Sequence, residues 1–173
     1  MGGAGMKRVL FATGELFRGA FRWRGRLSRE GYWQGWLGVM VVKVILNALV
    51  CGGNDYLLYA AGIWNLAAFL PLLAGAVRRY HDAGRPGWLA LLLGVPGRLL
   101  LVAGAVLGGI TLLFFLFSAG AEVNMVGFLR LMGASVLLLL AGGALCIANL
   151  VLLLRPGDPG ENAYGPPEPF PKG

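Results

Sequence analysis

The chain has 173 residues, of which 57% are apolar and only 13% are charged, and its mean hydropathy is +0.70. A soluble domain of this size carries about twice that share of charge, so the composition excludes an ordinary soluble protein and indicates a membrane protein. The net charge of +7 at pH 7 comes without a nucleic-acid-binding motif, so we expect no nucleic-acid partner.

The first predicted element is an amphipathic helix over residues 6–21 (MKRVLFATGELFRGAF) that lies on the inner leaflet. One face of this helix would carry Leu10, Thr13, Phe17 and Phe21.

Two basic residues at the start of this segment resemble a secretory signal, but the apolar run after them is too short, so we expect no cleavable signal peptide. Met6 is a second candidate start of translation.

Four apolar stretches follow, each close to the roughly 20 residues that a helix needs to cross the hydrocarbon layer. They are residues 32–50, 56–77, 99–118 and 131–154. The sequence therefore predicts an all-α polytopic membrane protein, with a single membrane domain over residues 1–155. Because Pro96 removes a helical hydrogen bond, residues 88–95 are expected to form a separate interfacial helix. One tilted helix over 88–118 is the alternative.

The distribution of lysine and arginine predicts the orientation. Four predicted spans put thirteen of the 15 basic residues on one side of the membrane, and Arg130 is the only one on the other side. The positive-inside rule then places both termini in the cytoplasm. The last segment, 156–173, contains ten Pro and Gly residues and is expected to be an irregular cytoplasmic tail.

Small residues and cysteines within the spans are interpreted as packing residues. The pairs Gly31/Gly35 and Gly104/Gly108 have the spacing of close helix contacts in membranes. Cys51 and Cys146 are interpreted as small apolar side chains and not as a disulfide.

Polar side chains inside the predicted spans include Lys43, Asn47, Asn65 and Asn149. An intramembrane lysine suggests function by default, and Lys43, Asn47 and Asn65 would suit a small transporter or a transporter subunit. The competing interpretation, which we favour, has the amides bonding between helices and Lys43 extending outward. No acidic residue lies at the same depth to complete an ion path.

Three polar stretches would meet at the cytoplasmic face: 23–33, 78–88 and 159–166. They read WRGRLSREGYW, RRYHDAGRPGW and PGENAYGP. Their order resembles the domain-of-unknown-function family 805, whose members are small bacterial inner-membrane proteins. The resemblance implies a location in the bacterial inner membrane and no particular activity. The segment from Trp88 to Arg155 is longer than in typical members, which have room there for about one span, so the family's number of spans is not carried over.

The candidate binding residues form a cytoplasmic, arginine-rich collar, made up of Arg26, Ser28, Arg29, Arg78, Arg79, His81, Asp82, Arg85, Asn162 and Tyr164. We expect it to bind anionic lipid headgroups, a small anionic ligand or a partner protein, which includes a second copy of the chain. Asp82 should pair with Arg78, or with Arg26 and Arg29. Asn162 and Tyr164 should contact residues 78–85 or 24–29, since a segment rich in Pro and Gly must find partners for its backbone groups elsewhere.

Catalysis is not expected. His81 is interpreted as a helix-end histidine paired with a carboxylate, and an enzyme acting on lipid headgroups through His81 is the least favoured alternative. Ser28 is interpreted as a helix N-cap. Asp82 could hardly orient the imidazole of its neighbour His81, because adjacent residues of a helix point in different directions. A lone histidine without cysteine partners predicts no metal and no cofactor.

Overall fold

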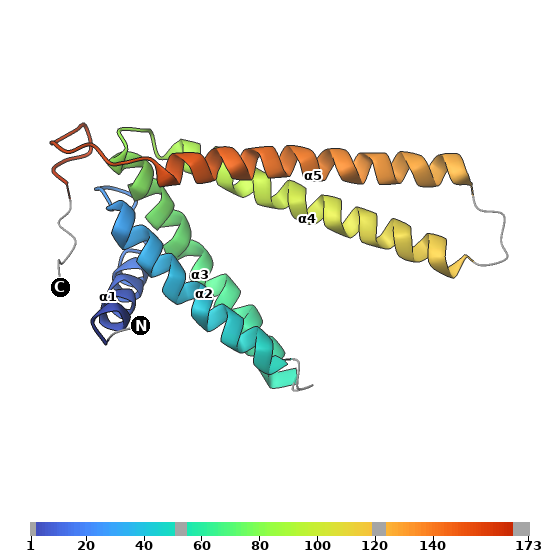
Figure 1. Cartoon of the computed structure of the whole chain (residues 1–173), viewed down its shortest axis with the longest axis horizontal. Coiled ribbons are helices and arrows are strands. Elements are labelled where there is room, and N and C mark those ends of the chain that lie inside the picture. Colours follow the sequence, from blue (N-terminus) through green and yellow to red (C-terminus); the bar gives the residue numbers. More distant parts are fainter. Residues whose placement is uncertain (1–2, 51–54, 119–123, 168–173) are drawn as a thin grey trace. The chain divides into compact units, whose positions relative to one another are not determined.

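The computed structural model describes residues 3–50, 55–118 and 124–167. Within these ranges the chain forms five helices and no β-strand (Figure 1). They are α1 (Gly3–Arg18), α2 (Arg29–Val50), α3 (Asp55–Asp82), α4 (Trp88–Phe117) and α5 (Met125–Leu154). The last four are long and apolar enough to cross a membrane. The predicted all-α architecture with four spans is confirmed.

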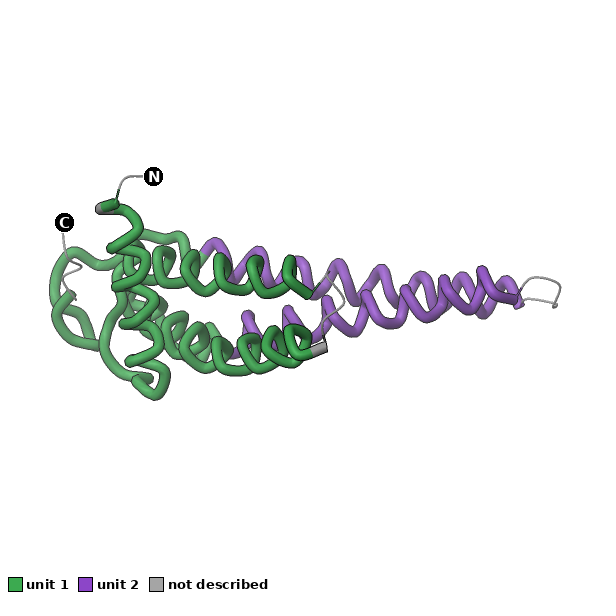
Figure 2. The backbone as a smooth tube through the Cα atoms, turned by 90° about the horizontal axis from the view of Figure 1, so that it is seen from below, with its two compact units in different colours: residues 1–90, 152–173 green, residues 91–151 purple. Residues whose placement is uncertain are grey.

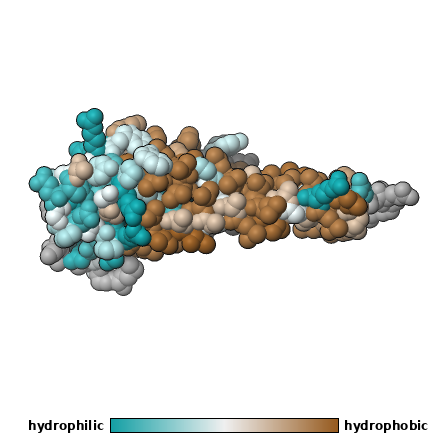
Figure 3. All heavy atoms as spheres, turned by 90° about the horizontal axis from the view of Figure 1, so that it is seen from above, coloured by the Kyte–Doolittle hydropathy of each residue, from teal (hydrophilic) through white to brown (hydrophobic). Residues whose placement is uncertain are grey.

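Contacts divide the chain into two compact units, which Figure 2 shows in different colours. Unit 1 comprises residues 1–90 and 152–173, and unit 2 comprises residues 91–151. Residues 152–167, including the described part of the tail, therefore group with α1, α2 and α3. Hydrophilic residues gather at one end of the face drawn in Figure 3, and apolar residues cover most of the rest of that face.

The predicted break in the third span is wrong, because α4 continues through Pro96 without interruption. A helix end inside a bilayer would leave backbone groups without partners, so the helix tolerates one missing hydrogen bond. Gly97 serves packing: a Cβ added there would lie 3.0 Å from Cys146 Sγ. Further along unit 2, Ser135 Oγ donates to the Gly104 carbonyl at 2.9 Å. The predicted close contact at Gly104 is thus confirmed.

Helix α1, the predicted amphipathic helix, packs against α2 and α3. Its buried face carries Ala12 and Leu16, and Leu16 fits between Gly35 of α2 and Gly75 of α3. Of the four residues predicted to share one face, Leu10 and Phe21 are exposed, whereas Thr13 lies against Gly38 and Phe17 packs on Trp64. Glycines on α2 and α3 allow this approach, which the pattern of α1 alone does not reveal.

Replacing Gly35 by alanine should destabilise unit 1. The added Cβ would lie 2.7 Å from Leu16 Cγ and 2.9 Å from the carbonyl oxygen of Ala12, a backbone atom that cannot rotate away. Overpacking of this kind costs about 1–3 kcal/mol. Gly62→Ala is the control, because a Cβ at Gly62 meets nothing within 4 Å. Thermal unfolding in detergent should separate the two variants, and equal midpoints would contradict the packing of α1.

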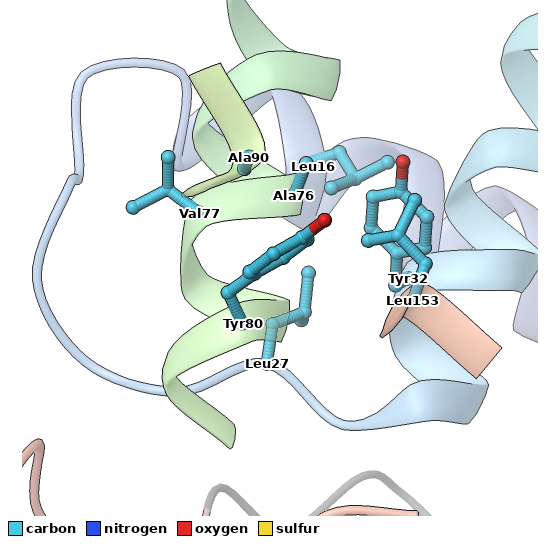
Figure 4. Close-up of a cluster of buried hydrophobic side chains, with 8 residues drawn as sticks. All are labelled: Leu16, Leu27, Tyr32, Ala76, Val77, Tyr80, Ala90 and Leu153. Atoms are coloured by element: carbon cyan, nitrogen blue, oxygen red, sulfur yellow. The ribbon is translucent and has the colours of Figure 1, made fainter. Parts of the chain in front are cut away.

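A cluster of buried apolar side chains holds together the part of unit 1 where α3 and α5 end and α2 begins (Figure 4). Tyr80 of α3 and Tyr32 of α2 meet Leu27 from the loop after α1 and Leu153 from the end of α5. Tyr80 and Leu153 are only 1% and 4% exposed. This cluster brings segments that are distant in the sequence to the place where the polar stretches lie.

Candidate functional site

Two helix ends position the polar stretches. Helix α2 begins at a cap in which the Gly31 amide donates to Ser28 Oγ at 3.2 Å, so the predicted N-cap is confirmed. Helix α3 ends at Gly84, which has a φ of 66°. The Gly84 amide donates to the His81 carbonyl and the Arg85 amide to the Tyr80 carbonyl, the hydrogen-bond pattern of a Schellman motif. This turn directs the chain away from α3 and leaves Arg85 exposed.

Asp82 lies between two buried guanidinium groups. Arg26 Nε donates to Asp82 Oδ1 at 3.0 Å, and Arg79 Nη1 donates to Oδ2 at 2.7 Å. Both arginine side chains are 0% exposed and that of Asp82 is 7% exposed. The predicted pairing with Arg26 is confirmed, whereas that with Arg78 is wrong. Arg78 instead directs its guanidinium group against Gly19, at the end of α1.

The same two arginines hold the tail. Arg79 Nε donates to the carbonyl of Leu153 at 3.1 Å, and Nη2 donates to that of Arg155. These are carbonyls at the end of α5, where a cation also complements the helix dipole. Arg26 donates to three tail carbonyls, those of Asp158, Gly160 and Gly165, at 2.5, 2.6 and 3.2 Å. Arg26 and Arg79 therefore both pair with Asp82 and hold the tail in place.

The tail turns on itself and docks, as predicted. Asn162 and Gly165 exchange two backbone hydrogen bonds, and Asn162 Oδ1 accepts from the Tyr164 amide at 2.9 Å. Asn162 Nδ2 donates to the His81 carbonyl at 3.0 Å. The ring of Tyr164 stacks on the imidazole with centroids 3.9 Å apart and planes at 5°. The expected contacts of Asn162 and Tyr164 with the end of α3 are confirmed.

His81 has a different partner from the expected carboxylate. Its Nδ1 lies 3.1 Å from the Gly25 carbonyl, which can only accept, so Nδ1 carries a proton. Ser28, His81 and Asp82 thus bond to three separate groups and do not form a hydrogen-bonded triad. Among the residues that the structure describes, no group of three His, Cys, Asp or Glu side chains could hold a metal ion.

A cleft of about 360 Å³ opens beside this network. It is lined by Arg22, Arg24, Gly25, Arg26, Arg78, Tyr164, Pro166 and Pro167. No carboxylate is among these lining residues. Of the predicted site residues, Arg26, Arg78 and Tyr164 meet here, whereas Arg29 and Arg85 are exposed and do not line the cleft.

Sequence reasoning missed Arg22 and Arg24, which it counted only as orienting charges. The three arginines at positions 22, 24 and 26 alternate in the sequence, but the bend at residues 24–25, where Gly25 has a φ of 90°, is not evident from that spacing. The prolines of the cleft were equally present in the tail, but which segment they would face is a matter of tertiary structure.

The profile of a protein family described as "Protein of unknown function (DUF805)" matches residues 20–166, which is most of the chain. The chain belongs to the DUF805 family. The inner membrane protein YhaI of Escherichia coli K12 is 42% identical to it over 72 residues, which are 42% of this chain and 61% of that protein. YhaI of Escherichia coli O157:H7 gives the same values. The chain thus spans about three fifths of these curated relatives, and no solved structure matches it.

Two of the polar residues in the predicted spans of this DUF805 protein, Asn65 and Asn47, bond within their own helices. Asn65 Nδ2 donates to the Ala61 carbonyl at 2.8 Å, and Asn47 Nδ2 donates to the Lys43 carbonyl at 2.8 Å. For Asn65 this corrects the expected bond between helices. In this way the side-chain amide donates to the carbonyl four residues earlier in its own helix and needs no partner on another helix. Lys43 is exposed on α2, as expected of a lysine that extends outward.

Proposed function

We propose that this DUF805 protein is a non-enzymatic protein of the bacterial inner membrane whose cleft binds an anionic group at the cytoplasmic face. The observation that carries the proposal is the lining of the cleft, in which four arginines converge without a carboxylate. Two of them, Arg22 and Arg24, are exposed, and neither takes part in a salt bridge within the described part of the chain. An anion between them would gain charge-assisted hydrogen bonds.

The chemical state of the other candidate groups supports binding without catalysis. Asp82 is held by two arginines, His81 donates to a backbone carbonyl, and Ser28 caps α2. A general base must be able to reach the proton that it removes, and these groups are already engaged with protein atoms. Arg22 and Arg24, by contrast, supply charge and hydrogen-bond donors, which is what recognition of an anion requires.

The distribution of basic residues supports an orientation with both termini in the cytoplasm. We expect a cysteine at position 85 or 161, in a chain without Cys51 and Cys146, to react with an impermeant maleimide only after the inner membrane is opened. Both positions are exposed, so access to the thiol depends on the side of the membrane. Labelling of intact spheroplasts at either position would show that the orientation is the opposite one and that the cleft does not face the cytoplasm.

Native mass spectrometry of the detergent-purified protein tests the binding, with phosphatidylglycerol as the anionic probe and phosphatidylethanolamine as the zwitterionic one. Wild-type protein should retain phosphatidylglycerol preferentially, and the double variant Arg22→Gln/Arg24→Gln should lower its affinity at least about tenfold. In 1 M salt the preference should shrink, because the screening length falls to about 3 Å.

The control is Lys7→Gln/Arg18→Gln, which removes the same charge from the same N-terminal segment, outside the lining of the cleft. Equal losses in the two double variants would mean that net charge alone attracts the lipid. A larger loss in Arg29→Gln/Arg85→Gln would move the binding surface from the cleft to the exposed arginines of the collar.

A further inference from the structure

Two chemically different sets of residues line the cleft. The first set, the charged wall, consists of the arginines, of which Arg22 and Arg24 are exposed. The second set, the apolar wall, consists of Tyr164, Pro166 and Pro167. A bare inorganic anion would use only the charged wall. A ligand that uses both carries an anionic group joined to an apolar or flat organic part.

The charged wall favours a dianion over a monoanion. Arg22 and Arg24 form no salt bridge among the described residues, and no carboxylate lines the cleft. A phosphate monoester has a charge of about −1.5 to −2 at pH 7 and three acceptor oxygens. A carboxylate or a sulfate ester has one charge. Planar guanidinium groups also match the oxygens of a phosphate in bidentate geometry.

The apolar wall is in place before any ligand arrives. His81 stacks on one face of Tyr164, and Asn162 Oδ1 accepts from the Tyr164 amide. Arg26 holds the Gly165 carbonyl, next to the first proline of the wall. A wall that is already ordered reduces the entropy lost when a ligand binds. The volume of about 360 Å³ lies at the small end of the range for ligand sites, about 300–1,000 Å³.

We propose that the cleft binds a phosphate monoester, with its phosphate on Arg22 and Arg24 and its organic part on Tyr164, Pro166 and Pro167. The inference rests on the proposed function, which it narrows from an anion to one class of anion. Two sources offer this chemistry at the cytoplasmic face of a membrane: the headgroup of a phosphomonoester lipid and a soluble phosphate ester.

Isothermal titration calorimetry on the detergent-purified full chain tests the class of ligand with phenyl phosphate, phenyl sulfate and inorganic phosphate. At pH 8 phenyl phosphate should bind at least about tenfold more tightly than phenyl sulfate, which has the same ring and one charge fewer. It should also bind more tightly than inorganic phosphate, which lacks the ring. Arg22→Gln/Arg24→Gln should abolish the advantage over the sulfate, and Lys7→Gln/Arg18→Gln should leave it within about twofold.

The advantage over phenyl sulfate should disappear at pH 5, because a phosphate monoester loses its second charge below a pKa of about 6. Phenyl sulfate keeps a single charge at both pH values. His81, which stacks on Tyr164, is present in both titrations, so the comparison of the two probes isolates the second charge of the phosphate. A phosphate advantage that persists undiminished at pH 5 would contradict recognition of the dianion.

The two sources separate in nanodiscs. Phosphatidic acid should displace phenyl phosphate at an at least about tenfold lower lipid fraction than phosphatidylglycerol if the ligand is a lipid, whereas the two lipids should displace it equally weakly if the ligand is soluble. Equal affinity for phenyl phosphate and phenyl sulfate, lost in Arg22→Gln/Arg24→Gln, would overturn the monoester while leaving the anion site standing. Absence of binding by every anion would overturn both proposals.

Discussion

Asp82→Asn should lower the free energy of unfolding by about 3–5 kcal/mol, because it leaves two buried guanidinium groups without their shared counter-charge. Both arginine side chains are fully buried, and the carboxylate bonds to each of them at 3.0 Å or less. Asparagine conserves the shape, so the loss reports the charge. Chemical denaturation in detergent, followed by the fluorescence of the tryptophans, measures the change.

Glu15→Gln is the matched control, since Glu15 also pairs with an arginine, at 2.9 Å, but in an exposed pair in which the Arg18 side chain is 76% accessible. Such pairs contribute about 0–1 kcal/mol. A double variant, Asp82→Asn with Arg79→Gln, should recover part of the loss because it removes one of the stranded charges. If Asp82→Asn were no more harmful than Glu15→Gln, the buried network would be wrong.

Arg26→Lys should release the tail although the positive charge remains. Arg26 reaches Asp82 and the carbonyls of Asp158, Gly160 and Gly165 at the same time through its planar fork. A lysine is a compact point charge with a different reach and cannot reproduce this set of bonds. Hydrogen bonds to charged groups contribute about 1.5–3 kcal/mol each, so loss of one or two should raise the open population of the tail at least tenfold.

Limited proteolysis with a glutamate-specific protease reads this opening, since Glu161 is exposed and lies inside the docked turn. Cleavage after Glu161 should be at least about tenfold faster in Arg26→Lys than in the wild type when opening is rapid. Arg85→Lys makes the same chemical change on an exposed side chain and should leave the rate unchanged. Equal rates in the two variants would show that something other than Arg26 secures the tail.

Release of the tail in Arg26→Lys should also change the proposed cleft, because Tyr164, Pro166 and Pro167 belong to the docked tail. A protein with a released tail would keep Arg22 and Arg24 but lose the apolar wall. It should therefore bind phenyl phosphate no better than inorganic phosphate. Of the predicted collar, Arg26 therefore both holds the tail and lines the cleft, whereas Arg22 and Arg24, which line the cleft as well, lie outside the predicted set.

Hydropathy and helix-end chemistry, read from the sequence alone, determined the four spans and the cap at Ser28. These features depend on local composition and on a capping side chain next to the helix, so they survive in any tertiary context. The contact of Asn162 and Tyr164 with the end of α3 was also predictable, because a segment without its own hydrogen-bond ladder must find partners elsewhere.

Only the tertiary structure decided which arginine does what. All the arginines look alike in the sequence, yet Arg26 and Arg79 are buried on Asp82 whereas Arg22 and Arg24 line an open cleft. The side of α1 that is covered was equally hidden, since it depends on Gly35 and Gly75 on other helices. The continuation of α4 through Pro96 overrode a local signal for a break. For the arginines and for α1 the outcome follows from packing between segments far apart in the chain, which local patterns do not encode.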